Sequence, residues 1–500
     1  MKKFSVAKKC GVFIFAAFLL FANLECGEIH QPIRNTIETQ IKKQDDISRI
    51  YYPTGELQQG YIKDEILIDA NSLEQAQEYA VTLNAVLVSY SNGLAVMQVP
   101  SADDSLIYAE RLCLDLPPVG LNYVYEISEN KEKVLSSPSD FSMQFFHQNM
   151  NNIKAWEITT GSLDVVVAVI DTGIDISHPK FEGRISEKSY NSHTDKQGIE
   201  YVEDDHNHGT HISGIIAAAQ DDGREFSGVA PDVTIMAIKS NVPNDPRLIE
   251  LASVIRGIRY AADNDVDIIN ISLGRSYQSG ENPQEKAAIE YAVDKGIVVV
   301  CAAGNDSSED VSYPAAYEES IAVSATDYQG RFDYSYSNYG SKLNIAAPGT
   351  NIYSTVINGY DSISGTSMAS ANATGVAALI KSKYPNFTVR QIKERLYSTV
   401  RDAGVLGFDY YYGHGIVDTY AALSGVQSYT ANIGDINEDG VVNAKDVTRL
   451  RRYLARGWED EGYIHEILAD VNSNSVLDAK DVTRLRRYLA GGWENDNALG

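Results

Sequence analysis

Between residues 144 and 425, apolar runs alternate with amphipathic segments. Short apolar runs rich in β-branched residues are separated by longer segments with helical spacing, and the runs read VVVAVI, TIMAIK, VDIINISL, GIVVVCAA and ESIAVSA. Strands that are apolar on both faces belong to a parallel sheet covered by helices. The segments Arg247–Asn264 and Gln284–Lys295 are long enough to be crossover helices. The pattern predicts an open α/β fold with helices on both faces of the sheet and ligands at the carboxyl ends of the strands.

A smaller domain is predicted ahead of this one, because the pattern changes repeatedly between residues 62 and 127. The order is strand EILIDA, helix Ser72–Asn84, strands AVLVSY and LAVMQVP, helix Ala102–Leu114 and strand NYVYEIS. This βαββαβ order describes a ferredoxin-like α+β unit. The following stretch, Ser128–Ser142, is polar and has no periodicity. It reads as an exposed connector suited to proteolytic cutting.

The N-terminus carries a targeting pattern. A basic start at Lys2, Lys3, Lys8 and Lys9 is followed by an apolar run over residues 11–22. This order predicts a secretory signal peptide over residues 1–27, and hence a secreted, extracellular protein, because the run is short for a membrane span. A retained membrane anchor is the alternative interpretation.

Charge and cysteine usage narrow the function further. The chain has 68 Asp and Glu against 42 Lys and Arg, so its net charge of −26 argues against nucleic-acid binding. Of the four cysteines, Cys301 lies in an apolar run and is predicted to be a buried strand residue. The other three precede residue 140, so a processed protein would keep one thiol and no internal disulfide.

Residues from 434 onward contain a tandem repeat, in which NAKDVTRLRRYLARGWE recurs as DAKDVTRLRRYLAGGWE. Acidic and amide residues take the offsets of an EF-hand-like loop around a hard cation, with Asp closing each loop. The pattern predicts two Ca²⁺ sites. The predicted ligands of the first are Asp435, Asn437, Asp439, the Val441 carbonyl, Asn443 and Asp446, and those of the second are Asp470, Asn472, Asn474, the Val476 carbonyl, Asp478 and Asp481.

Four polar residues stand at strand ends or helix starts of the large domain. Asp171 ends VVVAVI, His208 opens a predicted helix in HNHGTHISG, and Ser367 opens another in SGTSMAS. Acyl transfer requires such a set: a hydroxyl nucleophile, an imidazole base and a carboxylate that orients the imidazole. Asn305 follows a further strand in AAGN, where its amide and the Ser367 backbone N–H could bind an oxyanion.

The motifs DTGID, HGTHISG, INISLG, AAGN and GTSMAS occur in that order across the domain, and in this the chain resembles the subtilases, the peptidase S8 family of serine proteases. The resemblance implies that Asp171 orients His208, that His208 is the general base and acid, and that Ser367 is the nucleophile. It implies Asn305 as the oxyanion-hole residue, the backbone of Ser272, Leu273 and Gly274 as the substrate-binding edge, and the N-terminal unit as an inhibitory propeptide. The expected activity is that of a serine endopeptidase (EC 3.4.21.-) acting on protein or peptide substrates.

Lys180 departs from the subtilase pattern, because calcium-binding members have an aspartate there. Calcium in the large domain is therefore left open. A rival interpretation takes His206, His208 and His211 as a metal cluster of a metal-dependent hydrolase. It leaves GTSMAS and AAGN unexplained.

The repeat resembles a type I dockerin, which implies attachment to a cohesin module of a scaffold protein in a cellulosome-like complex. Two alternatives are a calcium-stabilised spacer, and a catalytically inactive binding protein docked on the scaffold. The expected domains are a signal peptide (1–27), a propeptide (28–140), the catalytic domain (144–425), a linker (426–433) and the dockerin (434–495). Candidate cohesin contacts lie at equivalent positions of the two copies: Ala444, Lys445, Leu450 and Arg451, and Ala479, Lys480, Leu485 and Arg486.

Overall fold

The structure is a computed structural model of the whole chain. It describes residues 57–58, 60–99, 116–127, 130–131, 143–220, 226–243, 245–405, 407–426, 434–436, 442–456, 469, 471 and 476–491. The predicted signal peptide and the predicted helix over residues 102–114 lie outside this part of the chain. The chain forms two compact units, of which the first is residues 1–124, 250–256 and 282–285, and the second is the remainder. None of the described helices is long and apolar enough to cross a membrane.

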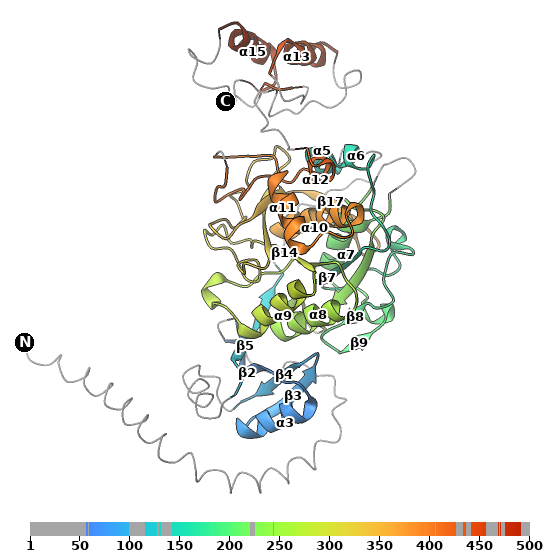
Figure 1. Cartoon of the computed structure of the whole chain (residues 1–500), viewed down its shortest axis with the longest axis vertical. Coiled ribbons are helices and arrows are strands. Elements are labelled where there is room, and N and C mark those ends of the chain that lie inside the picture. Colours follow the sequence, from blue (N-terminus) through green and yellow to red (C-terminus); the bar gives the residue numbers. More distant parts are fainter. Residues whose placement is uncertain are drawn as a thin grey trace, which may run out of the picture. The chain divides into compact units, whose positions relative to one another are not determined.

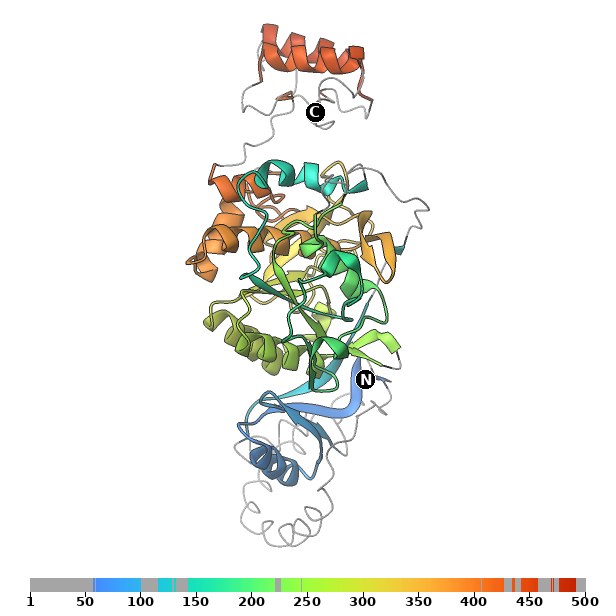
Figure 2. The ribbon, with the colours of Figure 1, turned by 90° about the vertical axis from the view of Figure 1, so that its right-hand side faces the viewer.

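In its described N-terminal residues, the first unit is an antiparallel sheet packed against a helix. Strand β2 (Tyr61–Asp69) pairs with β4 (Leu94–Gln98) on one side and β5 (Val119–Glu126) on the other, and β3 (Val86–Ser91) pairs with β4. The short β1 (Leu57–Gln58) pairs with β2. Figure 2 shows α3 (Leu73–Thr82) lying across this blue sheet. The described elements follow the predicted order.

Local sequence explains the start of α3. Its N-cap is Ser72, whose hydroxyl accepts a hydrogen bond from the Gln75 backbone N–H at 3.2 Å. The apolar faces of α3 and the sheet meet in one buried cluster that includes Ile66, Ala76 and Met97.

Residues 250–256 and 282–285, at the starts of two helices, also belong to the first unit. The Asn122 side chain donates to Glu65 at 2.9 Å and accepts from the Ala252 backbone N–H at 3.1 Å, where helix α8 (Leu251–Asp263) begins. Glu65 and Glu250 are 1% and 3% exposed. Burial is the largest cause that raises the pKa of Glu250, and nearby Glu65 raises it further against the lowering effect of Arg256, to about 7.

The second unit is built on a largely parallel sheet, as predicted. Its strand order is β16-β15-β14-β13-β7-β10-β8-β9, and only the β8–β9 pair is antiparallel. The bounds are β7 (Val166–Asp171), β8 (Tyr190–Asn191), β9 (Lys196–Gln197), β10 (Thr234–Lys239), β13 (Ile268–Ile271), β14 (Val298–Ala302), β15 (Ile321–Thr326) and β16 (Ile345–Pro348). Each predicted apolar run contains one of the parallel strands. Cys301 is buried in β14, as predicted.

Helices cover both faces of this sheet. Figure 1 shows α7 (His208–Ala217) and α10 (Thr366–Lys383) on one side of β7 and β14, with α8 and α9 (Pro283–Asp294) on the other. The close approach of α8 requires Gly257, because a Cβ there would come within 2.8 Å of Ile238 on β10. The remaining helices are α5 (Phe146–Asn149), α6 (Asn152–Ala155), α11 (Val389–Ser398) and α12 (Thr419–Ser424), with 3₁₀ turns at Pro179–Phe181, Ile199–Tyr201 and Tyr277–Ser279.

Two predictions about this unit were wrong in detail. The helix expected from Arg247 begins at Leu251, because residues before it form β12 (Asp245–Glu250), which pairs with β11 (Asn241–Val242) as an antiparallel hairpin. The connector expected after residue 128 contains a short strand, β6 (Asn130–Lys131). Strand β6 pairs with β18 (Gly359–Ser364), which pairs in turn with β17 (Ile352–Val356).

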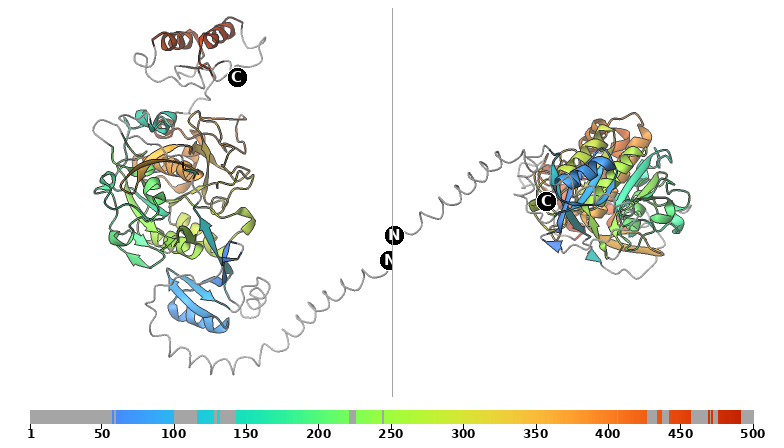
Figure 3. Two further views of the ribbon diagram at one scale, coloured as in Figure 1. Left: turned by 180° about the vertical axis from the view of Figure 1, so that it is seen from behind. Right: turned by 90° about the horizontal axis from the view of Figure 1, so that it is seen from below.

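The C-terminal repeat contributes two helices, α13 (Ala444–Arg456) and α15 (Ala479–Gly491). Figure 3 shows them side by side. Their apolar faces share a small core that contains Leu450 and Leu485, both fully buried, together with Ile436 and Val471.

Candidate active site

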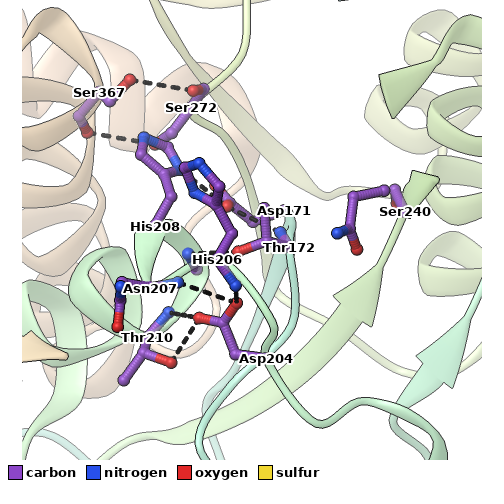
Figure 4. A network of polar contacts seen from close by, with 12 residues as sticks. Asp171, Thr172, Asp204, His206, Asn207, His208, Thr210, Ser240, Ser272 and Ser367 are labelled. Carbon is purple, nitrogen blue, oxygen red and sulfur yellow. Dashed lines mark hydrogen bonds and ion pairs between the residues drawn. The ribbon is translucent and has the colours of Figure 1, made fainter. Parts of the chain in front are cut away.

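Asp171 and His208 form the centre of the site (Figure 4). Asp171 is the last residue of β7, and one of its carboxylate oxygens accepts from His208 Nδ1 at 2.7 Å and from the Thr172 backbone N–H at 2.8 Å. Both side chains are almost fully buried. Because an ionised carboxylate can only accept, the bond places the proton of a neutral imidazole on Nδ1. His208 Nε2 is then the atom that can take a proton.

The loop before α7 fixes the position of His208. One Asp204 oxygen accepts from the backbone N–H groups of His206 and Asn207, and the other accepts from the backbone N–H and hydroxyl of Thr210. Burial raises the pKa of Asp204, but these hydrogen bonds outweigh burial and hold the pKa below its usual range. The anchored charge lies at the helix N-terminus, where it is favourable.

Packing against the turn after β7 fixes the same helix from below. Gly209 follows His208 directly, and a Cβ on it would overlap the Gly173 carbonyl oxygen. Glycine is therefore required at position 209 for His208 to reach Asp171.

Ser367 is the second residue of α10 and is 6% exposed. Its hydroxyl donates to the Ser272 carbonyl at 3.0 Å, and the Ser272 hydroxyl donates to the Ser367 carbonyl at 3.1 Å. Behind this pair, Asn270 on β13 donates to the Ser272 hydroxyl at 2.8 Å and accepts from Thr374 on α10 at 2.8 Å. These buried bonds tie the start of α10 to the carboxyl end of β13, so Ser367 and His208 meet at the same edge of the sheet (Figure 4).

The amide of Asn305 is held in one orientation. Its Oδ1 atom accepts from the backbone N–H and the hydroxyl of Thr366, both at 2.9 Å. Its Nδ2 atom lies 3.6 Å from the point where a Cβ on Gly365 would sit, beside the start of α10. With the oxygen engaged, the Nδ2 group beside Gly365 remains as the hydrogen-bond donor of this side chain.

Ser272, Leu273 and Gly274 follow β13 at the same carboxyl edge. The next residue, Arg275, exchanges backbone hydrogen bonds with Tyr313 at 2.9 and 3.1 Å. The structure thus brings together the predicted Asp171, His208, Ser367 and Asn305 and the predicted substrate edge.

The histidines of the rival metal interpretation have separate partners. His208 contacts Asp171, whereas His211 Nε2 lies 3.0 Å from the Ile352 carbonyl oxygen. His206 contributes its backbone N–H to the Asp204 loop. No group of three or more metal-binding side chains occurs within the described ranges.

Lys180 occupies a buried position near residue 219. It is 7% exposed, its ammonium donates to the Ala219 carbonyl at 3.1 Å and it lies 5.2 Å from the Phe226 ring centroid. The Lys180 ammonium therefore fills this position and is a hydrogen-bond donor to the Ala219 carbonyl.

The C-terminal repeat presents the same contacts twice. The Asn443 backbone N–H donates to Asp446 at 2.7 Å, and the Asp478 backbone N–H donates to Asp481 at 2.8 Å. Asp435, Asp446 and Asp481 are 2%, 0% and 0% exposed. The remaining described ligand candidate is Val476, and the others lie outside the described residues: Asn437, Asp439, Val441, Asp470, Asn472 and Asn474.

Two predicted cohesin contacts were wrong. Leu450 and Leu485 are fully buried in the core between α13 and α15, so they are not available to a partner. The other six candidates are exposed: Ala444, Lys445, Arg451, Ala479, Lys480 and Arg486.

Sequence reasoning missed the supporting residues of the site. Asp204, Thr366 and Asn270 hold His208, Asn305 and Ser272 through the bonds above. Asp204 lies two residues before HNHGTH, and this position could have suggested that it holds the loop in place. No pattern marks Asn270, because it lies inside an otherwise apolar strand.

Comparisons with known proteins agree with this geometry. Residues 162–415 match the model of the subtilase family, and residues 433–490 match the type I dockerin domain. The thermophilic serine proteinase of Bacillus sp. (strain AK1) is 36% identical over 291 residues, which is 56% of this chain and 67% of that protein. Subtilisin DY of Bacillus licheniformis is 40% identical over 273 residues, 52% of this chain and 90% of that protein.

Among solved structures, fervidolysin from Fervidobacterium pennivorans, a keratinolytic enzyme related to subtilisin, is similar at a TM-score of 0.62 and 27% identity. The match covers 75% of this chain and 63% of that chain. The matched family model, these relatives and the shared fold show that the chain belongs to the subtilase family of serine endopeptidases and carries a C-terminal type I dockerin domain.

Proposed function

We propose that the chain hydrolyses peptide bonds through an acyl-enzyme, with Asp171, His208 and Ser367 as its catalytic residues. The observation that carries the proposal is the buried 2.7 Å bond between Asp171 and His208 Nδ1, at the sheet edge where α10 presents Ser367. This bond leaves His208 Nε2 to act as the base.

In the first step, the Ser367 hydroxyl turns from the Ser272 carbonyl toward His208 Nε2, gives up its proton there and attacks the substrate carbonyl. Asp171 stabilises the imidazolium that forms. The Asn305 Nδ2 group and the Ser367 backbone N–H donate to the developing oxyanion. His208 then passes the proton to the leaving amine, and water releases the acyl group by the reverse sequence.

The edge Ser272–Leu273–Gly274 is proposed to hold the substrate by strand addition, because backbone hydrogen bonds recognise an extended peptide independently of its side chains.

Replacing Ser367 with Ala tests the mechanism. Hydrolysis of a denatured protein substrate should fall at least about 10³-fold. Ser382→Ala is the matched control, because this serine lies on the same helix and its hydroxyl only contacts the Ala378 carbonyl. Retained hydrolysis in Ser367→Ala, with normal folding by circular dichroism, would refute the assignment.

The N-terminal segments are proposed to govern delivery and timing. Residues 1–27 would direct secretion, residues 28–140 would assist folding and inhibit the catalytic domain (144–425), and residues 426–433 would link it to the dockerin (434–495). The described part of the propeptide has an apolar core of its own, which supports a domain that folds as a unit.

The dockerin is proposed to bind two calcium ions. Asp435, Asp446 and Asp481 are buried in this small domain, and a hard cation with oxygen ligands would offset part of the cost of burying three carboxylates. Bound calcium would contribute positive charge that fixes the loops before α13 and α15. The twelve residues predicted from the repeat would form the two ligand sets. Calorimetric titration of the intact protein should give at least two calcium ions per chain, and fewer than two would refute the assignment.

A cohesin module of a scaffold protein is the proposed partner, which would place the enzyme outside the cell in a scaffold-bound complex. The exposed cations Lys445 and Lys480 occupy equivalent positions in the two copies, at the starts of α13 and α15. Cohesin beads should retain the protein with calcium and release it with chelator. Changing both lysines to Glu should weaken retention, whereas Arg390→Ala on α11 should not. Retention that is insensitive to chelator would contradict the proposal.

A further inference from the structure

A buried lysine that the proposed mechanism does not use lies beside Asp171. Lys239 is the last residue of β10, stands opposite Asp171 in the parallel pairing with β7, and is 7% exposed. Lysine side chains are almost never buried to this extent unless their charge is paired. The Lys239 ammonium donates to the Thr172 carbonyl and to a carboxylate oxygen of Asp205, both at 2.8 Å.

The two acceptors belong to the segments that carry two of the proposed catalytic residues. Thr172 follows Asp171 directly, in the turn after β7. Asp205 stands three residues before His208, in the loop that leads into α7. Figure 4 shows Asp171 and Thr172 next to this loop. The Lys239 ammonium therefore bridges the segment of Asp171 and the segment of His208.

Further hydrogen bonds hold the bridge at both ends. The Ser240 backbone N–H donates to the Asp171 carbonyl at 2.8 Å, which fixes the main chain beside Lys239 against the end of β7. The Asn241 side-chain amide donates at 2.7 Å to the same Asp205 oxygen that Lys239 contacts. The Asp205 side chain is 42% exposed, and these two donors hold its carboxylate in one orientation.

Neutral contacts also join the two segments. The Gly209 backbone N–H donates to the Thr172 hydroxyl at 2.9 Å, and the Asp204 backbone N–H donates to the Ile174 carbonyl at 3.1 Å. These bonds remain when the ammonium is removed, so its loss should change the fit of the segments without separating them. A displacement of about 1 Å at a catalytic group can lower a rate about 10²-fold.

We propose that Lys239 is a positioning residue for the reaction, a role that rests on the proposed function of Asp171 and His208. Its ammonium holds the turn after Asp171 against the loop before His208. This contact keeps the Asp171 carboxylate at hydrogen-bond distance from His208 Nδ1. Lys239 acts through Thr172 and Asp205, and a purely structural role would change stability without changing turnover per active site.

Lys239→Met tests the role, because it keeps an unbranched side chain and removes the ammonium. Turnover is measured per active site titrated with a serine-directed fluorophosphonate, so unfolded enzyme does not count. The kcat value should fall about 10- to 100-fold, with KM unchanged within about twofold. Lys239→Arg retains the cation and its donors, so its kcat should exceed that of Lys239→Met at least about fivefold. Lys188→Met is the control and should leave kcat unchanged, because Lys188 is an exposed lysine paired with Asp265.

Asp205→Ala removes one acceptor of the bridge from a partly exposed side chain, and it tests the role even where Lys239→Met does not fold. Its kcat should fall about 3- to 10-fold. Adding Asp205→Ala to Lys239→Met should lower kcat by less than about twofold more, because both substitutions remove the same contact.

An unchanged kcat in Lys239→Met or, where that variant does not fold, in Asp205→Ala would overturn the proposal. Equal kcat values for the Met and Arg variants, or additive effects of the two substitutions, would also overturn it. A lower melting temperature with unchanged turnover per active site would show a structural role alone. If Ser367→Ala is inactive, these outcomes remove only the role of Lys239, whereas retained hydrolysis in Ser367→Ala removes the proposed function as well.

Discussion

Glu250 should make the first unit less stable as the pH rises. This carboxyl is 3% exposed, faces the buried Glu65 and is near Arg256, and its pKa is raised to about 7. Glu250→Gln keeps the size of the side chain and removes its titration. The variant therefore isolates the contribution of this one proton.

The direction of the change in stability with pH depends on whether the folded or the unfolded state binds the extra proton. The pKa is about 7 in the folded unit and 4.5 when the group is exposed, so the folded unit binds the extra proton between these values. Stability due to Glu250 is then full below pH 4.5 and is lost as the pH rises through 7. At 1.36 kcal/mol per pH unit, the total loss is about 3 kcal/mol.

Hydrogen exchange in the uncut Ser367→Ala chain measures this loss. The amides of β2 and α3 report opening of the first unit. After correction for intrinsic rates, their protection should fall about tenfold per pH unit between pH 5 and 6.5. In chains that also carry Glu250→Gln, this fall in amide protection with pH should be absent. Glu281→Gln is the control, because Glu281 is a solvent-exposed carboxylate paired with Lys286.

Equal pH slopes in the chains with and without Glu250→Gln would refute the reasoning, since the buried proton would then make no difference. A slope of opposite sign that depends on Glu250 would show that the group is ionised in the folded unit.

Three further substitutions test the site. Asn305→Ala should lower kcat about 10²- to 10³-fold with little change in KM, because one donor to the oxyanion is lost; steady-state kinetics check this, and an unchanged kcat contradicts the oxyanion role. Gly209→Ala should prevent formation of the Asp171–His208 pair, because its Cβ overlaps the Gly173 carbonyl; activity at the level of the unsubstituted enzyme would show that α7 can shift freely. Lys180→Ala should lower stability by about 1–3 kcal/mol, since a buried hydrogen bond and its charge are lost; an unchanged melting temperature would contradict this.

Much of the fold could be predicted because buried strands leave a strong signal. The runs around Asp171, Lys239 and Cys301 are apolar on both faces, and the structure has a parallel strand at each. Helix boundaries were harder to predict from the sequence. The pattern around Arg247 suits a helix, but pairing with β11 holds this residue in a strand, and such pairing depends on residues distant in the sequence.

The residues of the candidate site could be predicted from motifs, whereas the residues that hold them in place could not. Asp171, His208 and Ser367 each stand beside recognisable turns. The bonds from Asn270 to Ser272 and Thr374 involve polar residues inside apolar or small-residue segments, so only the packed structure joins them. Likewise, Leu450 was predicted as a contact because it lies in a conspicuous repeat, but its side chain fills the dockerin core. A repeat shows that two positions are equivalent without showing which way they face.

Labelling with a serine-directed fluorophosphonate tests the central claim, that His208 activates Ser367. The mature enzyme should gain one adduct, peptide mapping should place it on Ser367, and chelator should not prevent the reaction. His208→Ala should slow labelling at least about 10³-fold. An adduct on another residue, undiminished labelling in His208→Ala, or proteolysis that persists after complete labelling would contradict the claim.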